Sequence, residues 1–186
     1  MCPSFQLDFY RYFSQFCLLL KTNLRLHMPK PQKQYWLMKT EADCYSIDDL
    51  ARDRVVAWEG VRNYQARNFM MQHMSVGDTV FFYHSNGTKQ SPAGIYGVAR
   101  VASSAHPDMS QFDPKDEHFD PKSTPAKPIW YCVDVAYVKK WKTPLYLADI
   151  KLDPHLSGIP VAQTGSRLSV QPVSRTHGEY LVKAFK

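Results

Sequence analysis

The chain has 186 residues, of which 44% are hydrophobic and 22% are charged. This composition is typical of one packed domain, and it excludes a wholly disordered chain and argues against two full-sized domains. Lys and Arg number 23 against 17 Asp and Glu, so the net charge of +6 permits an anionic partner such as nucleic acid without requiring one.

The first 27 residues differ from the rest of the chain. They carry six aromatic residues, and their longest apolar run, 16–20, is far shorter than the ~20 residues of a membrane span. They lack the basic start and the small-residue cleavage site of a signal peptide. Met28 begins Met-Pro-Lys-Pro, a suitable start of the protein. We therefore predict that residues 1–33 are an N-terminal extension, or alternatively a short amphipathic helix for a partner, and that 34–186 form the domain.

Short secondary-structure elements are predicted from residue 34 onward. Runs of strand-forming residues between turn signals predict strands over 34–39, 55–58, 79–84, 94–102, 129–138 and 168–173. Helices are predicted over 63–74, 145–151 and 178–184, and a further short helix is predicted to start at Ser46 in a capping-box-like Ser-Ile-Asp-Asp sequence. Because strands do not alternate with long helices, the pattern favours a mixed, mostly antiparallel barrel over a doubly wound fold.

A long polar loop with five prolines is expected over 104–128. A loop of this length is either functional or mobile. It contains the local repeat Phe-Asp-Pro-Lys at 112–115 and 119–122, which is too short to indicate a repeat architecture.

The segment 58–70 has the most unusual pattern of polar residues. At 100° per residue, Asn63 and Arg67 share a helix face with Met70 and Met74. Buried polar groups need partners, because each unpaired one costs ~1–3 kcal/mol. Two interpretations remain open: an internal hydrogen-bond network that ties the helix to the barrel, or a pocket wall whose amide and guanidinium groups match base edges and phosphates.

Several aromatic and basic residues have both a functional and a structural interpretation. Trp36, Trp58 and Trp130 are suited to an aromatic cage for a base, or to the hydrophobic core. The sequence Tyr-His-Ser at 83–85 ends a strand, where ligands often bind at a barrel mouth, although a satisfied edge histidine is the more frequent case. Trp141 is surrounded by three lysines, and this group is expected to be a solvated face, with a contact to a nucleic-acid backbone as the alternative.

Metal and cofactor motifs are not found. The acidic loop 113–120 does not match the spacing of a calcium loop, and no phosphate-binding loop, nucleophile elbow or His-Glu-x-x-His sequence occurs. Four cysteines without a Cys-x-x-Cys pair exclude a zinc ribbon and indicate reduced thiols in an intracellular protein. We predict no metal and no cofactor.

Several stretches together resemble the EVE domain family. They are Tyr-Trp-Leu-Met-Lys-Thr-Glu at 35–41, Gly-Val-Arg-Asn-Tyr-Gln-Ala-Arg-Asn at 60–68, Phe-Tyr-His-Ser at 82–85 and Arg-Leu-Ser-Val-Gln-Pro-Val at 167–173. The string at 60–68 is long and specific, and the resemblance extends from about Tyr35 to the C-terminus. One departure is Ala42, where relatives usually carry proline, which alters a turn but no pocket group.

The resemblance implies an α+β, PUA-like fold, that is, a mixed and mostly antiparallel pseudo-barrel with short helices packed around it. It also implies a pocket between barrel and helix that accepts a modified nucleobase. The positions of this sequence that match the family's motifs are Trp36, Lys39, Ser46, Trp58, Arg62, Asn63, Tyr64, Gln65, Arg67, Asn68, Tyr83, His84 and Ser85.

The function expected from this resemblance is non-catalytic binding of a modified base, with modified cytosine as the first candidate, in DNA or RNA. Trp58 or Tyr64 would stack on the base. The amides of Asn63, Gln65 and Asn68 would read its edges, and Arg62, Arg67 and Lys39 would hold phosphate. The implied partners are nucleic acid with a modified base and a partner enzyme, with no membrane and no metal. The implied location is cytoplasmic in a bacterium and nuclear in a eukaryote.

Two other functions remain open. The first is a hydrolase of a modified pyrimidine nucleoside, similar to ASCH domains, in which residues 39–41 supply a nucleophile and an acid–base pair. The second is a small-ligand adaptor domain that does not bind nucleic acid. Turnover of a modified nucleoside would establish the first, and heat protection by metabolites alone would favour the second.

Overall fold

The computed structural model describes residues 33–85, 87 and 91–185. Residues 1–32 of the predicted N-terminal extension, which include Cys2 and Cys17, therefore lie outside the described residues. The strands are β1 (Tyr35–Glu41), β2 (Val55–Ala57), β3 (Thr79–Ser85), β4 (Gly94–Val101), β5 (His106–Pro107), β6 (Tyr131–Cys132), β7 (Asp134–Tyr146) and β8 (Val170–Val173). The helices are α2 (Ile47–Asp53), α3 (Tyr64–Gln72), α4 (Leu147–Leu152) and α5 (Arg175–Ala184), with 3-10 turns η1 (Met109–Phe112), η2 (Pro154–Leu156) and η3 (Pro160–Ala162).

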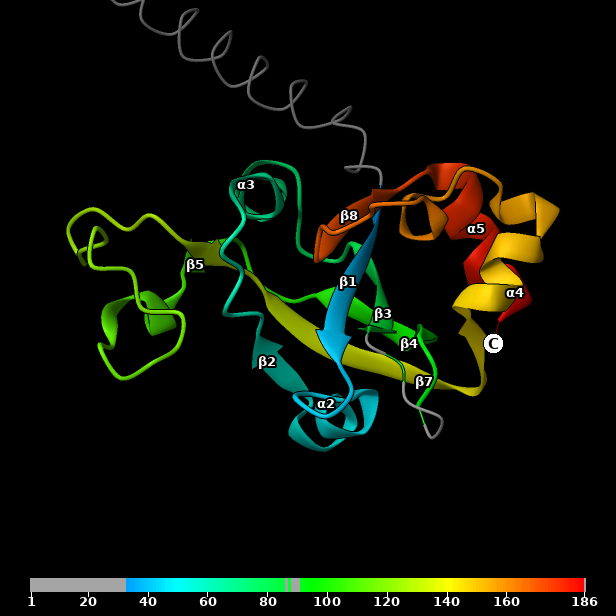
Figure 1. Cartoon of the computed structure of the whole chain (residues 1–186), viewed down its shortest axis with the longest axis horizontal. Helices are drawn as coiled ribbons and strands as arrows, with labels where there is room; N and C mark the ends of the chain where they lie inside the picture. Colours follow the sequence, from blue (N-terminus) through cyan, green and yellow to red (C-terminus); the bar gives the residue numbers. More distant parts are fainter. Residues whose placement is uncertain (1–32, 86, 88–90, 186) are drawn as a thin grey trace, which may run out of the picture. The chain divides into compact units, whose positions relative to one another are not determined.

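The main feature is a curled six-stranded sheet in the order β2-β7-β4-β3-β1-β8 (Figure 1). β1 and β3 are parallel, and the other pairs of this sheet are antiparallel. Strands β5 and β6 form a separate two-stranded ribbon. This architecture confirms the predicted mixed, mostly antiparallel half-barrel with short helices around it.

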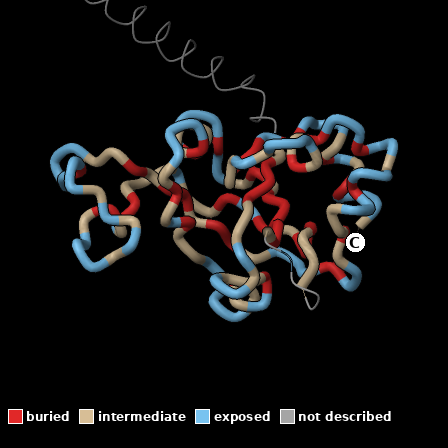
Figure 2. Tube along the Cα trace, in the orientation of Figure 1, coloured by how far each residue is buried: buried red, intermediate tan, exposed pale blue. Residues whose placement is uncertain are grey.

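Both faces of the central strands are buried, because helices cover each of them. In β1, Trp36 and Met38 point into a cluster with α2 and α3, whereas Leu37 points into a second cluster with α4 and α5. In β3, Phe82 and Phe81 divide between the same two clusters. Full burial of each such side chain contributes ~1.5–3 kcal/mol, so the alternation fixes which way each strand-end residue points. In Figure 2 the buried positions follow the central strands and the outer turns of the helices are exposed.

The starts of α2 and α3 follow the sequence signals. Ser46 forms a capping box with Asp49, as predicted. The Asn63 side-chain oxygen accepts hydrogen bonds from the backbone N–H groups of Gln65 and Ala66, at 2.9 and 3.1 Å. Such a cap is worth ~0.5–2 kcal/mol. Asn63 is therefore the residue before α3 and not its first helical residue, and the predicted end at residue 74 is two residues too late.

Several predictions for the second half of the chain were wrong in their bounds, among them the helix predicted over 145–151, since α4 begins at Leu147 and ends at Leu152. The strand predicted over 129–138 is divided into β6 and the longer β7, which continues to Tyr146. β7 pairs with both β4 and β2 and shifts register twice against β4, so its exposed lysine-rich stretch is held by backbone pairing and not by an alternating pattern. The terminal helix begins at Arg175, because Ser174 caps it. The last strand begins at Val170.

The expectation that Trp141 lies on a solvated face was also wrong. Trp141 is 3% exposed and stacks on Phe185, with ring centroids 5.2 Å apart. Only the neighbouring lysines are exposed. The sequence does not reveal this core position, because burial does not alternate in this stretch of β7; Trp141 packs in the cluster that contains Ile150 and Leu181.

The segment 104–128 is organised by its own side chains. The amide of Gln111 is buried and donates to the carbonyl groups of Asp108 and Trp130, at 2.6 and 2.8 Å. In each Phe-Asp-Pro-Lys copy, the Asp carboxylate accepts the backbone N–H of the Lys two residues later, at 2.9 Å. The repeat is thus a repeated turn, which explains its sequence without a ligand.

Several classes of feature are absent from the part of the chain that the structure describes. It contains no helix that is both long and apolar enough to span a membrane. It holds no cluster of three or more His, Cys, Asp or Glu residues arranged to bind a metal ion. Cys44 and Cys132 are both free thiols.

Candidate functional site

A pocket of about 470 Å³ lies beside the carboxyl end of β1. Its lining comes from four segments distant in the sequence: residues 39–45, residues 56–63 between β2 and α3, Glu117 and His118 in the long excursion, and Ser169 before β8. The parallel pairing of β1 and β3 brings the ends of both strands to this edge, where Glu41 is opposite Ser85. The pocket is therefore a product of the sheet topology.

Trp58 provides the aromatic surface of this pocket. Its ring packs edge-on against Phe82, with an interplanar angle of 87° and centroids 5.5 Å apart. Its backbone N–H donates to Val133 O at 2.9 Å. The side chain is 8% exposed and lines the pocket, so the indole is held in place and still presents a surface to a ligand.

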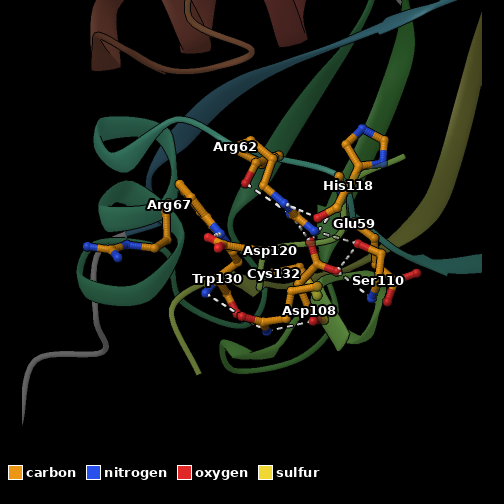
Figure 3. A network of polar contacts seen from close by, with 12 residues as sticks. Glu59, Arg62, Arg67, Asp108, Ser110, His118, Asp120, Trp130 and Cys132 are labelled. Atoms are coloured by element: carbon orange, nitrogen blue, oxygen red, sulfur yellow. Dashed lines mark hydrogen bonds and ion pairs between the residues drawn. The ribbon is translucent and has the colours of Figure 1, made fainter. Parts of the chain in front are cut away.

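Asp108 fixes the wall formed by residues 59–63 (Figure 3). Its Oδ2 accepts from Gly60 N at 2.9 Å and from Arg62 Nη1 at 2.7 Å. The other donors of Arg62 reach His118 O and Ser110 Oγ, at 2.7 and 2.8 Å. Burial of Asp108 would raise the pKa of its carboxyl group, but the hydrogen bonds from Ser110, Arg62 and Gly60 outweigh it and lower the pKa. Asp108 therefore stays ionised and holds the wall through a buried ion pair.

Gly60 is required where the wall turns. Its φ is +80°, in the left-handed region that favours glycine. A Cβ atom there would lie 2.9 Å from Cε1 of His118. The wall and the excursion are thus in direct contact, and any larger residue would push His118 out of the pocket lining.

Carboxylates outnumber cations in the lining of this pocket. Glu41, Glu59 and Glu117 face Lys39 and Arg62. The guanidinium of Arg62 is fully engaged in the wall, so its charge is already paired. Carboxylate oxygens accept hydrogen bonds from amino groups such as N4 of cytosine, whereas they repel phosphates. The pocket is suited to a base edge and not to a phosphate.

Four of the thirteen residues predicted for the site line this pocket: Lys39, Trp58, Arg62 and Asn63. The side-chain oxygen of Asn63 is used as the cap of α3. Lys39 is half-buried, and its Nζ donates to Ser166 O at 2.8 Å. Burial lowers the pKa of this amine.

Three predicted residues have a structural position instead. Trp36 is 2% exposed and donates to Asp78 Oδ2 at 3.0 Å. Ser46 caps α2. His84 is 3% exposed, its Nε2 accepts from Ile47 N at 3.1 Å, and its ring stacks on Tyr96. The hydrogen bond between Ile47 and His84 ties β3 to the start of α2.

The α3 residues Tyr64, Gln65, Arg67 and Asn68 lie outside the pocket lining. Arg67 donates to Ile129 O at 3.0 Å and to Asn68 Oδ1 at 2.7 Å, and its guanidinium lies 4.8 Å from the centre of the Tyr64 ring. Tyr64 in turn stacks on Trp130, with ring centroids 4.8 Å apart. Figure 3 shows Arg67 on α3, directed away from the Asp108 network. These contacts match the internal-network interpretation of the helix face.

The remaining two predicted residues, Tyr83 and Ser85, line a second pocket of about 440 Å³, which Lys39 also lines. The sequence interpretation missed Glu59, Glu117, His118 and Ser169 in the first pocket. Nothing local marks Glu117 and His118, because their link to the wall is made between distant residues: Arg62 Nε donates to His118 O, and Gly60 lies against the His118 ring.

One arrangement resembles a catalytic Cys-His-Asp group. Cys132 Sγ lies 3.6 Å from His106 Nδ1, and His106 Nε2 lies 2.9 Å from Asp134 Oδ1. Burial and nearby carboxylates raise the pKa of the Cys132 thiol to about 12. Cys132 is also fully buried. A neutral, inaccessible thiol is not a nucleophile, so this group does not form an active site.

The curled sheet, with a pocket between the strand ends and the segment leading into α3, defines the class of protein. A model of the EVE domain matches residues 34–184, and the chain belongs to this family. It is 38% identical to thymocyte nuclear protein 1 of Danio rerio over 171 residues, which are 82% of this chain and 72% of the relative.

Two solved structures are similar throughout the domain. A protein from Pseudomonas putida has a TM-score of 0.75 and 46% identity, and the match covers 80% of this chain and 97% of that chain. The human THYN1 protein, solved in complex with 5-methylcytosine containing DNA, has a TM-score of 0.73 and 34% identity, and the match covers 82% of this chain and 97% of that chain.

Proposed function

We propose that this chain is a non-catalytic module that binds a modified base, with 5-methylcytosine in DNA as the first candidate. The observation that carries the proposal is the composition of the first pocket, which is lined by the fixed indole of Trp58, by Asn63 and by three carboxylates. The complex of the human THYN1 protein with 5-methylcytosine containing DNA supports the choice of base.

Binding requires the base to leave the duplex stack. Extrusion costs a few kcal/mol. Stacking on Trp58 would return ~1–3 kcal/mol. The carboxylate of Glu59 or Glu117 would accept the exocyclic amino group, and the amide nitrogen of Asn63 would donate to an acceptor on the base edge. The 5-methyl group would add apolar contact with the indole.

The roles first expected for two arginines change in this proposal. The guanidinium groups of Arg62 and Arg67 are engaged in hydrogen bonds to other residues of the chain. Moving either to a phosphate would break a network, which costs ~1–3 kcal/mol per unsatisfied buried group. We therefore assign them to shaping the pocket and not to holding phosphate.

Lys39 is the observation that favours the rival function, a hydrolase. Burial lowers the pKa of its amine, which makes a lysine more nucleophilic at neutral pH. Its Nζ, however, donates to the backbone carbonyl of Ser166. If the purified protein releases product from 5-methylcytidine or an acylated cytidine, and Lys39→Ala abolishes this, the non-catalytic proposal is wrong.

The test is fluorescence anisotropy at one fixed salt concentration. Matched DNA and RNA oligomers, each single- or double-stranded, would carry one unmodified cytosine, 5-methylcytosine or 5-hydroxymethylcytosine. We expect at least a tenfold preference for one modification, which corresponds to ~1.4 kcal/mol. Equal binding of all oligomers would show that the protein binds nucleic acid only through its basic surface, without recognising a base. No binding to any oligomer would favour a domain that binds a small ligand.

Trp58→Leu is the matching variant, because it keeps an apolar side chain and removes the π surface. We expect it to lose the preference for the modified base. Tyr64→Leu is the control, since Tyr64 is an exposed aromatic residue outside the pocket lining. If both variants lose the preference equally, the base does not bind in this pocket.

The cellular setting follows from the same proposal. The name of the Danio rerio relative contains the words nuclear protein. We infer a nuclear location if the chain is from a eukaryote, and a partner enzyme that acts on the bound nucleic acid. Fractionation of cells that express the tagged chain would check the location.

A further inference from the structure

The second pocket differs from the first in its charge. It lies beside the same edge of the sheet, between Lys39 and Tyr83 on one side and α4 and the loop 161–167 on the other. Three cations line it: Lys39 from β1, Lys151 from the last turn of α4, and Arg167 from the loop before β8. No carboxylate is among the described residues that line it.

Two of the three cations of this pocket lack partners within the described part of the chain. Lys151 and Arg167 make no hydrogen bond or ion pair with any described residue, and both are exposed. Lys39 gives one of its three N–H groups to Ser166 O. By comparison, Lys140 and Arg62 each pair with a carboxylate. The pocket therefore has donors that are available to an anion.

Bringing three like charges to one concave surface is unfavourable in the free protein. Lys39 is more than 100 positions away from Lys151 and Arg167 in the sequence, so local sequence does not explain why the three residues converge. The hydroxyl of Ser166 also lines the pocket; it accepts from Gln171 Nε2 at 2.7 Å, so its own O–H group remains a donor, whereas the hydroxyl of Ser85 donates to Thr40 O. Positive charge with hydroxyl donors is the lining that phosphate groups need.

We propose that this second pocket binds a backbone phosphate next to the base that occupies the first pocket. This proposal rests on the proposed function and adds the direction in which the nucleic-acid backbone leaves the bound base. Lys39 lines both pockets, so a nucleotide with its base beside Trp58 has its phosphate group directed past Lys39 toward Arg167 and Lys151. The phosphate group then lies in a pocket that neither Glu59 nor Glu117 lines, and these carboxylates would repel it.

The experiment is a salt titration of oligonucleotide binding by wild type and by the double variant Lys151→Ala/Arg167→Ala. Neutralising phosphates releases counterions, so each lost contact lowers the slope of log K against log salt by about 1. We expect the double variant to lose about tenfold or more in affinity for modified and unmodified oligomers alike. We expect its preference between the two oligomers to be unchanged.

Lys139→Ala/Lys183→Ala is the matched control, because both lysines are exposed and neither lines the second pocket. An equal loss in both double variants would show that the effect is general surface charge and would overturn the proposal. An unchanged salt slope in Lys151→Ala/Arg167→Ala would also overturn it. Melting temperatures of both variants would confirm that they are folded.

A neutral backbone substitution identifies the phosphate directly. One methylphosphonate would be placed at each position around the modified base in turn. At one position we expect wild type to lose affinity while the double variant loses none, since the contact is already absent. Additive losses at every position would contradict the assignment.

The source of the phosphate is tested with inorganic phosphate and a 5-methylcytidine monophosphate as competitors. Displacement of the oligomer by the nucleotide, and not by inorganic phosphate at the same ionic strength, would support a phosphate attached to the bound base. A further outcome is a decrease of the salt slope in the double variant while no oligomer shows a base preference. That result would support the phosphate site and would contradict the proposed recognition of a modified base.

Discussion

The two pockets that meet at Lys39 have opposite charge and opposite construction. The first is lined by more carboxylates than cations, and its wall is held by the buried ion pair of Asp108 and Arg62. The second is lined by cations alone among the described residues, and two of them have no partner within the described chain. An acidic, aromatic pocket is suited to a base edge, whereas a basic pocket is suited to a phosphate. In the proposed nucleotide site, Lys39 at the end of β1 lies at the boundary between the base and the phosphate.

The largest expected effect is the loss of the wall of the first pocket. Asp108→Ala should destabilise the domain by ~3–5 kcal/mol, because it leaves Arg62 and the Gly60 N–H without their buried partner. Urea unfolding would measure this change. Asp108→Asn should lose less, since one oxygen acceptor remains. If Asp108→Ala is as stable as wild type, the wall is not held by this ion pair.

The next effect concerns the helix that borders the first pocket. Arg67→Ala should lower stability by ~1–3 kcal/mol, because it removes the hydrogen bonds to Ile129 and Asn68. It should change oligonucleotide affinity less than Trp58→Leu does. Thermal unfolding and anisotropy on the same sample would separate the two. Loss of binding without loss of stability would make Arg67 a ligand-binding residue after all.

Lys39→Met tests the boundary between the pockets. The variant keeps most of the side-chain length and removes the charge, so it should lower affinity by about tenfold, or ~1.4 kcal/mol. Because Lys39 lines both pockets, the salt slope and the base preference should both decrease. A decrease in the salt slope alone would assign Lys39 to the second pocket, and a decrease in the base preference alone would assign it to the first.

The smallest expected effect is on the pH dependence of stability. Burial lowers the pKa of His84 below the ordinary value of 6.5, the nearby Asp48 raises it and Lys140 lowers it further. The unfolded chain therefore binds the proton first, so the contribution of His84 is fully present above pH ~6.5 and is lost as the pH falls toward the lowered folded pKa. Urea midpoints between pH 8 and pH 5 would measure the loss.

The matched variant for this effect is His84→Gln, which keeps an acceptor for the Ile47 N–H. We expect it to reduce the dependence on pH in this range and to leave the acid loss that comes from Asp108 at lower pH. That second loss follows from the lowered pKa of Asp108, whose contribution decreases as the pH falls through it. An unchanged dependence in His84→Gln would contradict the assigned role.

The local signals in the sequence were sufficient for most elements of the fold. Ser46 and Asn63 marked the starts of α2 and α3, and β1 and β3 carried the expected strand-forming residues. The long strand β7 was misplaced, because its exposed lysines and Pro144 do not alternate with apolar residues. Backbone pairing with β4 and β2 holds such a stretch in place, and pairing partners are not visible in a single sequence.

The site was predictable only where it coincided with a motif. The segment 58–70 was singled out because Asn63 and Arg67 share a helix face with Met70 and Met74, and its first part, 58–63, does form a pocket wall. The residues of α3 that follow it make internal contacts, since Tyr64 and Arg67 pack against Trp130 and Ile129. The same residue types can form an internal hydrogen-bond network or bind a ligand, so the sequence could not separate the two interpretations.

By itself the sequence determined the strand and helix signals, the family resemblance and the mild positive charge. The tertiary structure decided which cations have partners: it joined Arg62 to Asp108, 46 positions away, and brought Lys39, Lys151 and Arg167 together without a carboxylate. The reason is physical. Secondary structure depends on neighbours along the chain, whereas the charge of a pocket depends on groups that only the parallel pairing of β1 with β3 and the packing of α4 bring to one surface.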